Sequence, residues 1–240
     1  MPVFRSAMFV LLIALTVGCV SSEKLSDADP TASNSHTKQH FEFIEHGTVP
    51  AAGSLYTKDD VFVGSCVLVT PTVAMTAGHC IEYGNLSYAR FGDEKLLIDV
   101  QCLHKHYFVG DDIGILLFES ESQHDPMPII DNVDFIPKMF PLNTIAHGGG
   151  KKKISKDSTY HYYGILNNRP NEIVFLPLKA SVWFGDSGGA LVYKDAVGRI
   201  ILIGIITHFS AMGDEIYECA ARRVDNFNLY DDIWQPWIPK

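Results

Sequence analysis

Three absences limit what this chain of 240 residues can be. It lacks an excess of basic residues, because 19 lysines and arginines stand against 28 acidic residues, giving a net charge of −9. This argues against nucleic acid as a partner, since phosphate binding needs a basic face. A membrane-spanning segment is also missing, because the apolar run from Ala7 to Val17 is too short to cross a bilayer well. No extended apolar period of 3.6 residues appears before the last dozen residues, which argues against a helical fold.

The N-terminal segment is typical of an export signal. Arg5 and the terminal amine precede the apolar run, and Gly18 then precedes Cys19. The tail of this segment resembles a bacterial lipobox, in which the cysteine is lipidated, although its leucine stands four places before Cys19 rather than three. Ordinary signal cleavage nearby is the alternative. We therefore expect residues 1–18 to be removed and the protein to be extracellular, periplasmic or anchored to the outer membrane through lipidated Cys19.

The rest of the chain shows the pattern of an all-β protein. Residues 19–40 are polar and serine-rich, which predicts a flexible tether. From residue 41 onward, short apolar runs alternate with turn signals. A proline-containing acidic segment at 119–138 has the composition of a connection between two halves. The predicted strands include 61–69, 73–75, 96–103, 112–118, 142–148 and 199–209, and a short helix is predicted around 228–238, anchored by Trp234 and Trp237.

The stretch Gly185-Asp186-Ser187-Gly188-Gly189 carries the strongest chemical signal. Glycines on both sides let the backbone make a tight turn that exposes the Ser187 hydroxyl. Such a turn can direct the N–H groups of Gly185 and Ser187 at one point, where a negative oxygen would be stabilised. A serine hydroxyl is a poor nucleophile at neutral pH unless a base and a group that orients the base lie beside it.

Both partners occur upstream. Thr76-Ala77-Gly78-His79-Cys80 supplies a histidine, and Asp112 heads the apolar run Ile113–Leu117. Asp111 is the alternative carboxylate, but Asp112 directly precedes the predicted strand. The order His79, Asp112, Ser187, each in its local context, resembles the chymotrypsin/trypsin-like serine proteases, tightly at these motifs and loosely over residues 44–238.

The resemblance implies two packed six-stranded antiparallel β-barrels, at about 41–125 and 138–227 of a protease domain spanning 41–238. It also implies the roles of the triad. Ser187 would attack the substrate carbonyl, His79 would carry the proton, and Asp112 would orient the imidazole. Gly185 and Ser187 would form the oxyanion hole. The expected function is a serine endopeptidase acting on proteins or peptides, with no cofactor, metal or nucleic acid.

The substrate pocket departs from the family pattern. By resemblance it is formed by Ser181, Trp183, Thr207, His208 and Phe209. Ser181 stands where trypsin-type pockets carry an aspartate, so we expect no preference for lysine or arginine. Trp183 replaces a usual cysteine. Thr207 matches the position whose hydroxyl supports the catalytic aspartate.

Cysteines and the activation segment give further expectations. Five cysteines are an odd number, and a lipidated Cys19 would leave four. The resemblance implies a disulfide between Cys66 and Cys80, while Cys102 and Cys219 are either bonded or buried free thiols. Family members are activated by cleavage, after which the new terminal amine pairs with the aspartate before the nucleophile, here Asp186. Only the poor match Ile44-Glu45-His46-Gly47 is present, so either cleavage occurs there or Asp186 has a different partner.

Several rival interpretations remain. His104 and His106 lie two apart and could bind a metal, but with no third ligand nearby solvated side chains are favoured. Residues 148–153, three glycines followed by three lysines, lack the spacing of a phosphate-binding loop, and a flexible basic loop is predicted instead. A catalytically silent binding module on the same scaffold is the alternative to the endopeptidase. An esterase of the α/β type would need alternating helices and the order Ser, Asp, His, which the chain lacks.

Overall fold

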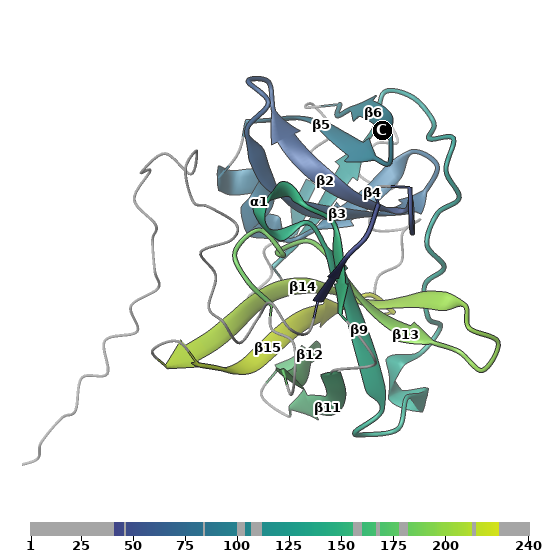
Figure 1. Cartoon of the computed structure of the whole chain (residues 1–240), viewed down its shortest axis with the longest axis vertical. Coiled ribbons are helices and arrows are strands. Elements are labelled where there is room, and N and C mark those ends of the chain that lie inside the picture. The colour runs from purple at the N-terminus through teal and green to yellow at the C-terminus, as the bar shows by residue number, and fades with distance from the viewer. Residues whose placement is uncertain are drawn as a thin grey trace, which may run out of the picture.

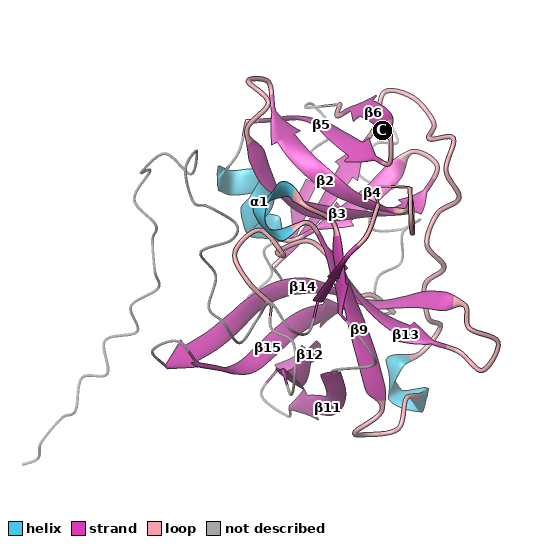
Figure 2. Cartoon of the chain, viewed as in Figure 1, coloured by secondary structure: helices cyan, strands magenta, loops and turns pink. Residues whose placement is uncertain are grey.

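The chain folds into two antiparallel sheets, one in each half of the domain (Figure 1). The computed structural model describes residues 41–45, 47–83, 85–99, 104–106, 112–155, 160–166, 169–177, 182–212 and 215–225. In this part of the chain strands dominate, and helical structure is confined to short turns (Figure 2). The predictions for residues 1–40 and for a helix at 228–238 lie outside the described residues.

The N-terminal half forms a barrel of six strands with one added strand at its edge. The sheet runs in the order β6-β5-β2-β3-β4-β8-β7. An antiparallel bridge between Ile98 and Phe118 joins the end of β6 to the end of β8, and the Glu119 N–H donates to the Leu97 carbonyl across the same seam. Six strands therefore close into a ring. The bounds are β2 Ala52–Thr57, β3 Phe62–Thr70, β4 Val73–Thr76, β5 Leu86–Phe91, β6 Glu94–Leu97, β7 His104–His106 and β8 Ile113–Leu117, with helix α1 at Gly78–Tyr83 between β4 and β5.

The C-terminal half closes in the same way. Its sheet runs β1-β10-β9-β11-β12-β15-β14-β13, and an additional pairing of β9 with β13 closes a ring of six strands, with β1 and β10 branching from β9. The bounds are β1 Phe41–Phe43, β9 Pro141–Ala146, β10 Lys153–Ser155, β11 Tyr160–Leu166, β12 Arg169–Pro177, β13 Ala190–Lys194, β14 Ile200–Met212 and β15 Glu215–Arg223, with short 3-10 helices η3 Val133–Phe135 and η4 Gly148–Gly150. The predicted all-β class with two barrels is confirmed.

Strand β14 explains why the barrels pack together. Its near-continuous apolar run predicts a strand with little exposed face. In the structure Leu202 and Ile205 join the core cluster of the N-terminal barrel, while Ile203 and Ile206 join the cluster inside the C-terminal barrel. All four are fully buried. The strand therefore has apolar partners on both faces, and this fixes one barrel against the other.

The predicted connecting segment runs along the side of the molecule from one barrel to the other (Figure 1). The Met127 N–H donates to the Leu68 carbonyl on β3. The next residue, Pro128, accepts at its carbonyl from the Leu202 N–H on β14, and the Ile130 N–H donates to the Leu202 carbonyl. The connection is thus hydrogen-bonded to both barrels. No helix in the described part of the chain is long and apolar enough to span a membrane.

Candidate active site

The two barrels meet at the turn that carries Ser187. Ser65 on β3 makes the contact, because its N–H donates to the Ser187 carbonyl at 2.8 Å and its hydroxyl donates to the Gly185 carbonyl at 3.0 Å. Gly188 completes the contact from the other side. A Cβ on Gly188 would lie 2.0 Å from the Ser65 carbonyl oxygen, and the Gly188 φ of 84° favours glycine as well. The close approach of the two barrels at this point therefore requires a residue without a side chain.

His79 and Asp112 are paired through both carboxylate oxygens. His79 is the second residue of α1, and Asp112 directly precedes β8. The His79 backbone N–H donates to Asp112 Oδ1 at 2.8 Å, while the imidazole Nδ1 lies 2.6 Å from Asp112 Oδ2. Gly78 leaves room for this carboxylate, since a Cβ there would stand 3.0 Å from Oδ1. The arrangement holds the ring with Nδ1 toward Asp112, which leaves Nε2 for another partner.

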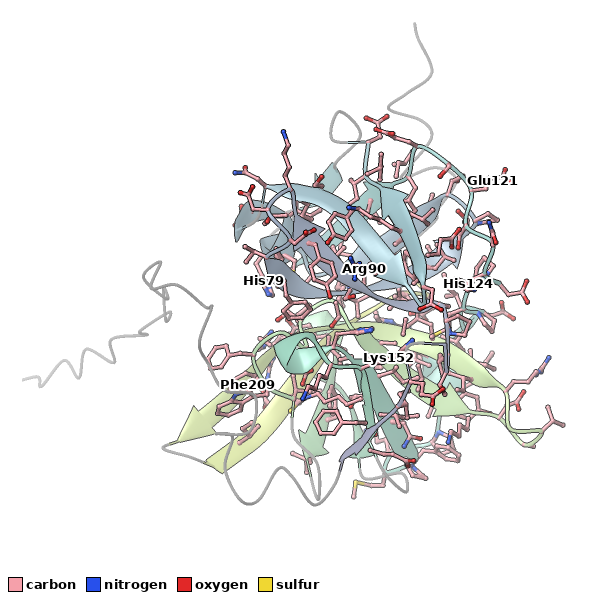
Figure 3. All side chains as sticks on the ribbon, turned by 45° about the horizontal axis from the view of Figure 1, so that its top comes forward. His79, Arg90, Glu121, His124, Lys152 and Phe209 are labelled. Carbon is pink, nitrogen blue, oxygen red and sulfur yellow. The ribbon has the colours of Figure 1, made fainter. Side chains whose placement is uncertain are left out.

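The electrostatics of this pair favour the charged imidazole. Burial opposes a positive charge on His79, but the hydrogen bond that its ring donates to Asp112, aided by interactions with Cys80 and by the Asp112 charge, raises the pKa of His79 to about 10. The ring stays only partly buried, so it keeps access to solvent. Figure 3 shows His79 at the edge of the N-terminal barrel, on the side that faces the C-terminal barrel.

The turn around Ser187 is held by its own backbone. The Asp186 N–H donates to the Trp183 carbonyl, the Gly189 N–H to the Asp186 carbonyl, and the Gly188 N–H to Ile206 on β14. Within the described part of the chain, the N–H groups of Gly185 and Ser187 donate to no protein acceptor. Gly185 has a φ of 85°, which suits a residue without a Cβ. Two amide donors are thus left available beside the serine.

Ser187 and the His79 loop are in direct contact. Cys80, the residue after His79, directs its Sγ at the Ser187 carbonyl at 3.7 Å. The Ser187 hydroxyl lies 3.5 Å from the Thr207 carbonyl on β14, a weak interaction at this distance. The fold therefore gathers the three motifs, which stand far apart in the sequence, at the junction of the two barrels.

The predicted Cys66–Cys80 disulfide is wrong. Both residues are buried free thiols. The strand position that faces Cys80 is Gly64, where a Cβ would lie 2.8 Å from Cys80 Sγ, and Cys66 instead contributes to the N-terminal core. Burial raises the pKa of the Cys66 thiol well above its usual range, which keeps it protonated. Cys219 is a third buried free thiol, and Cys102 lies outside the described residues.

Three aromatic rings, two of them from residues expected to form the substrate pocket, pack against one another. The Trp183 and Phe209 rings stack with centroids 5.7 Å apart, and the Phe184 ring meets both edge-on. Phe184 is 58% exposed, although sequence reasoning did not single it out. His208 beside Phe209 is exposed and Thr207 is buried. The Thr207 hydroxyl donates to the Ala220 carbonyl on β15 and contacts His208 Nδ1, so the expectation that it supports Asp112 is wrong.

Asp186 has a different partner, as the second of the two alternatives expected, although the sequence did not identify which residue it is. It is 1% exposed, and its Oδ2 lies 2.7 Å from Nζ of Lys153, the first residue of β10. The prediction of a flexible basic loop at 148–153 is therefore wrong for its last two lysines. Lys152 and Lys153 are both buried, and only Lys151 is exposed. From the sequence alone, a lysine that is buried at the start of a strand cannot be distinguished from a lysine that is exposed to solvent.

Some predicted residues lie outside what the structure describes. These are Cys19, Asp111 and Ser181, while for His104 and His106 the structure gives the β7 backbone without their side chains. Among the described residues no group of three histidine, cysteine or acidic side chains gathers in a way that could hold a metal ion.

Comparison with solved structures identifies the fold. The chain is similar to the crystal structure of Rv3671c from M. tuberculosis H37Rv, a serine-to-alanine mutant described as the inactive form, with a TM-score of 0.57 over 80% of this chain and 91% of that chain. The fold is chymotrypsin-like. Sequence identity is 15%, so this likeness concerns the fold alone. No family model matches the chain, and no curated protein matches its sequence.

Proposed function

We propose that this chymotrypsin-like domain is a serine endopeptidase that hydrolyses peptide bonds through an acyl-enzyme. The observation that carries the proposal is the His79–Asp112 pair, with a contact of 2.6 Å, packed beside the turn of Ser187 through Cys80. Acyl transfer needs a histidine that is oriented by a carboxylate and can reach a serine hydroxyl. The oriented histidine and the contact between its loop and the serine turn support this proposal.

In the proposed reaction Ser187 Oγ attacks the carbonyl carbon of the scissile peptide bond. The neutral form of His79, whose fraction grows as pH rises toward its pKa of about 10, takes the serine proton at Nε2, because Nδ1 is held by Asp112. The imidazolium then gives that proton to the leaving amine as the C–N bond breaks, which leaves an ester on Ser187. Water then gives a proton to the same imidazole and attacks the ester carbonyl carbon. The imidazolium returns that proton to Ser187 Oγ as the ester C–O bond breaks, which releases the acid and restores the enzyme. Asp112 stays ionised throughout and stabilises the charged ring.

The oxyanion that forms at the substrate carbonyl would be stabilised by the N–H groups of Gly185 and Ser187. Within the described residues neither N–H group donates to a protein acceptor, so no existing hydrogen bond has to be broken when the substrate binds. Each such donor is typically worth about 3 kcal/mol in the transition state.

For the substrate we propose peptides with apolar rather than basic side chains at the scissile position. The aromatic cluster of Trp183, Phe184 and Phe209 supports this, since it offers exposed apolar surface beside Ser187. Ser181 in place of an aspartate removes the anion that would bind lysine or arginine. We also propose that the protein is exported, and that Cys19 anchors it to a membrane through a lipid.

The proposal is tested by incubating the full chain with a peptide library and identifying the cleaved bonds by mass spectrometry. We expect cleavage that disappears in Ser187→Ala and persists in Ser87→Ala, a control on β5 away from the junction. Preferred cleavage after lysine or arginine would refute the pocket assignment while leaving the endopeptidase intact. Mass analysis of the mature N-terminus tests Cys19, because an unlipidated start downstream of it would remove the anchor.

A catalytically silent binding module is the second candidate. It is favoured by the 3.5 Å contact of the Ser187 hydroxyl with the Thr207 carbonyl, since a hydroxyl directed at a carbonyl is not directed at a base. On this reading the aromatic cluster would bind a peptide without cleaving it. Library peptides that bind the folded protein but remain intact would support the module over the endopeptidase.

A further inference from the structure

The chain contains a buried ion pair directly before the proposed nucleophile. Lys153 Nζ lies 2.7 Å from Asp186 Oδ2, with 9% and 2% of the two side chains exposed. The same carboxylate accepts the Trp183 N–H at 2.8 Å and the Gly148 N–H at 2.9 Å. Asp186 is therefore tied both to the segment that leads into the Ser187 turn and to the glycine turn between β9 and β10.

The glycine turn is shaped around this pair. A Cβ on Gly148 would stand 2.4 Å from Asp186 Oδ1 and 2.9 Å from Lys153 Nζ, so any side chain there would displace one of the two charges. Gly148 leads through η4 into β10, whose first residue is Lys153. Residues 148–153 thus form a tight turn that places the Lys153 ammonium group beside the Asp186 carboxylate.

The segment that the family would cleave is already placed elsewhere. β1 pairs with β10, with Phe43 opposite Lys153, and the Ile44 N–H donates to the Lys152 carbonyl at 3.1 Å. The Ile44 nitrogen is therefore used in an intact chain as an ordinary sheet donor. The positively charged partner of Asp186 is the Lys153 ammonium group and not the Ile44 nitrogen.

The neighbouring lysine, Lys152, contacts a different group. Its side chain is also buried, but its Nζ donates to the Val49 carbonyl at 2.7 Å, next to the start of β2. Lys152 lies where the two barrels approach each other (Figure 3). Lys151 is exposed. Three consecutive lysines thus have three different environments, and the ion pair with Asp186 is formed by Lys153.

From these contacts we infer that Lys153 is a positioning residue that holds Asp186, and with it the turn of Gly185 and Ser187, in the working arrangement without cleavage before Ile44. The inference rests on the proposed function. The ammonium of Lys153 takes the place of the terminal amine that the family resemblance calls for. The domain is thus active as an intact chain, and no activating protease is required for it.

The first test concerns the intact chain. The full chain with a blocked terminal amine is assayed for peptide cleavage, and its mass is measured before and after. We expect full activity with the bond between Phe43 and Ile44 unbroken. Activity that appears only after cleavage at this bond would overturn the inference.

The second test removes the charge. Lys153→Met is compared with Lys151→Met, its exposed neighbour, and with Lys153→Arg, which keeps the charge. Loss of one partner from a buried pair predicts a fall in kcat of about 100- to 1000-fold for Lys153→Met with KM less affected, no change for Lys151→Met, and partial recovery for Lys153→Arg. Equal kcat in Lys153→Met and Lys151→Met would overturn the inference.

A measurement that needs no activity separates this inference from the proposed function. Hydrogen exchange of the amides of Gly188 and Gly189 reports the turn directly, since these groups donate to Ile206 and Asp186. We expect faster exchange in Lys153→Met than in Lys151→Met. If the wild-type chain cleaves nothing but exchange rises in this way, the proposed function fails and the positioning role stands. Unchanged exchange would contradict the positioning role whatever the activity.

Discussion

Gly64 and Cys80 lie face to face across the junction of β3 and α1. A Cβ on Gly64 would stand 3.9 Å from Cys80 Cβ and 2.8 Å from Cys80 Sγ. The first distance is close to the mean of about 3.8 Å for bonded cysteines. The position that could bridge to the histidine loop is therefore occupied by glycine, and Cys80 is left to contact the Ser187 carbonyl.

This geometry predicts that Gly64→Cys forms a disulfide with Cys80. Closing a loop of this length should raise the free energy of unfolding by about 3 kcal/mol under oxidising conditions. A non-reducing peptide map identifies the bond, and denaturant unfolding with and without reductant measures its effect. Gly64→Ser is the matched control without a thiol. A map in which the new cysteine pairs with Cys66, or with nothing, would contradict the geometry.

Asp112→Asn should disable the proposed chemistry without unfolding the domain. An amide in place of the carboxylate can no longer accept at both oxygens, so the imidazole loses the tautomer that leaves Nε2 ready to take a proton. We expect kcat to fall on the order of 10⁴-fold. Steady-state kinetics on a cleaved peptide measures it, with circular dichroism as the check on folding. A loss below tenfold in a folded variant would remove Asp112 from its role.

The pH dependence of stability should carry the signature of His79. Its folded pKa, raised to about 10, lies above the ordinary 6.5, so the folded state binds the proton more tightly than the unfolded state does. The stability that this pair supplies is complete below pH 6.5 and is lost as pH rises toward 10. Denaturant unfolding at pH 6 and pH 10 should show a smaller decline in His79→Gln than in the wild type. Identical declines in the two proteins would disprove the raised pKa.

Phe184→Ala should weaken substrate binding and leave stability nearly unchanged. The ring is 58% exposed, so its removal opens no cavity, and a surface substitution of this kind changes stability by about 0.5 kcal/mol. A substrate side chain packed on the cluster would lose apolar contact, which predicts a rise in KM of about tenfold. Phe135→Ala, at an exposed aromatic of η3, is the control. An equal KM in both variants would place the substrate elsewhere.

Much of the fold and the central residues could be predicted from the sequence. Short apolar runs between turn signals indicated strands, and the long run of β14 indicated a strand covered on both faces, as Leu202 and Ile203 show. The pairing of His79 with Asp112 was predicted from the resemblance of their two motifs to those of the chymotrypsin/trypsin-like serine proteases, and the two side chains are in contact at 2.6 Å. In each case the signal is local to a few neighbouring residues.

The remaining features depend on contacts between distant segments. Gly64 and Cys66 stand two apart on one strand, where alternation directs both to the same face, so the sequence does not tell which of them opposes Cys80. The Lys153–Asp186 pair depends on how tightly the chain turns at Gly148. Neither feature has a pattern of its own, and each is fixed only when β3 or β10 takes its place in the sheet.

The most direct test of the account is covalent labelling of the folded chain with a fluorophosphonate, followed by mass analysis of the modified peptide. The account predicts one adduct per chain, located on Ser187, formed slowly in His79→Ala and absent from Ser187→Ala. A folded wild-type chain that gains no adduct, or gains it on another serine, would contradict the claim that Ser187 is an activated nucleophile.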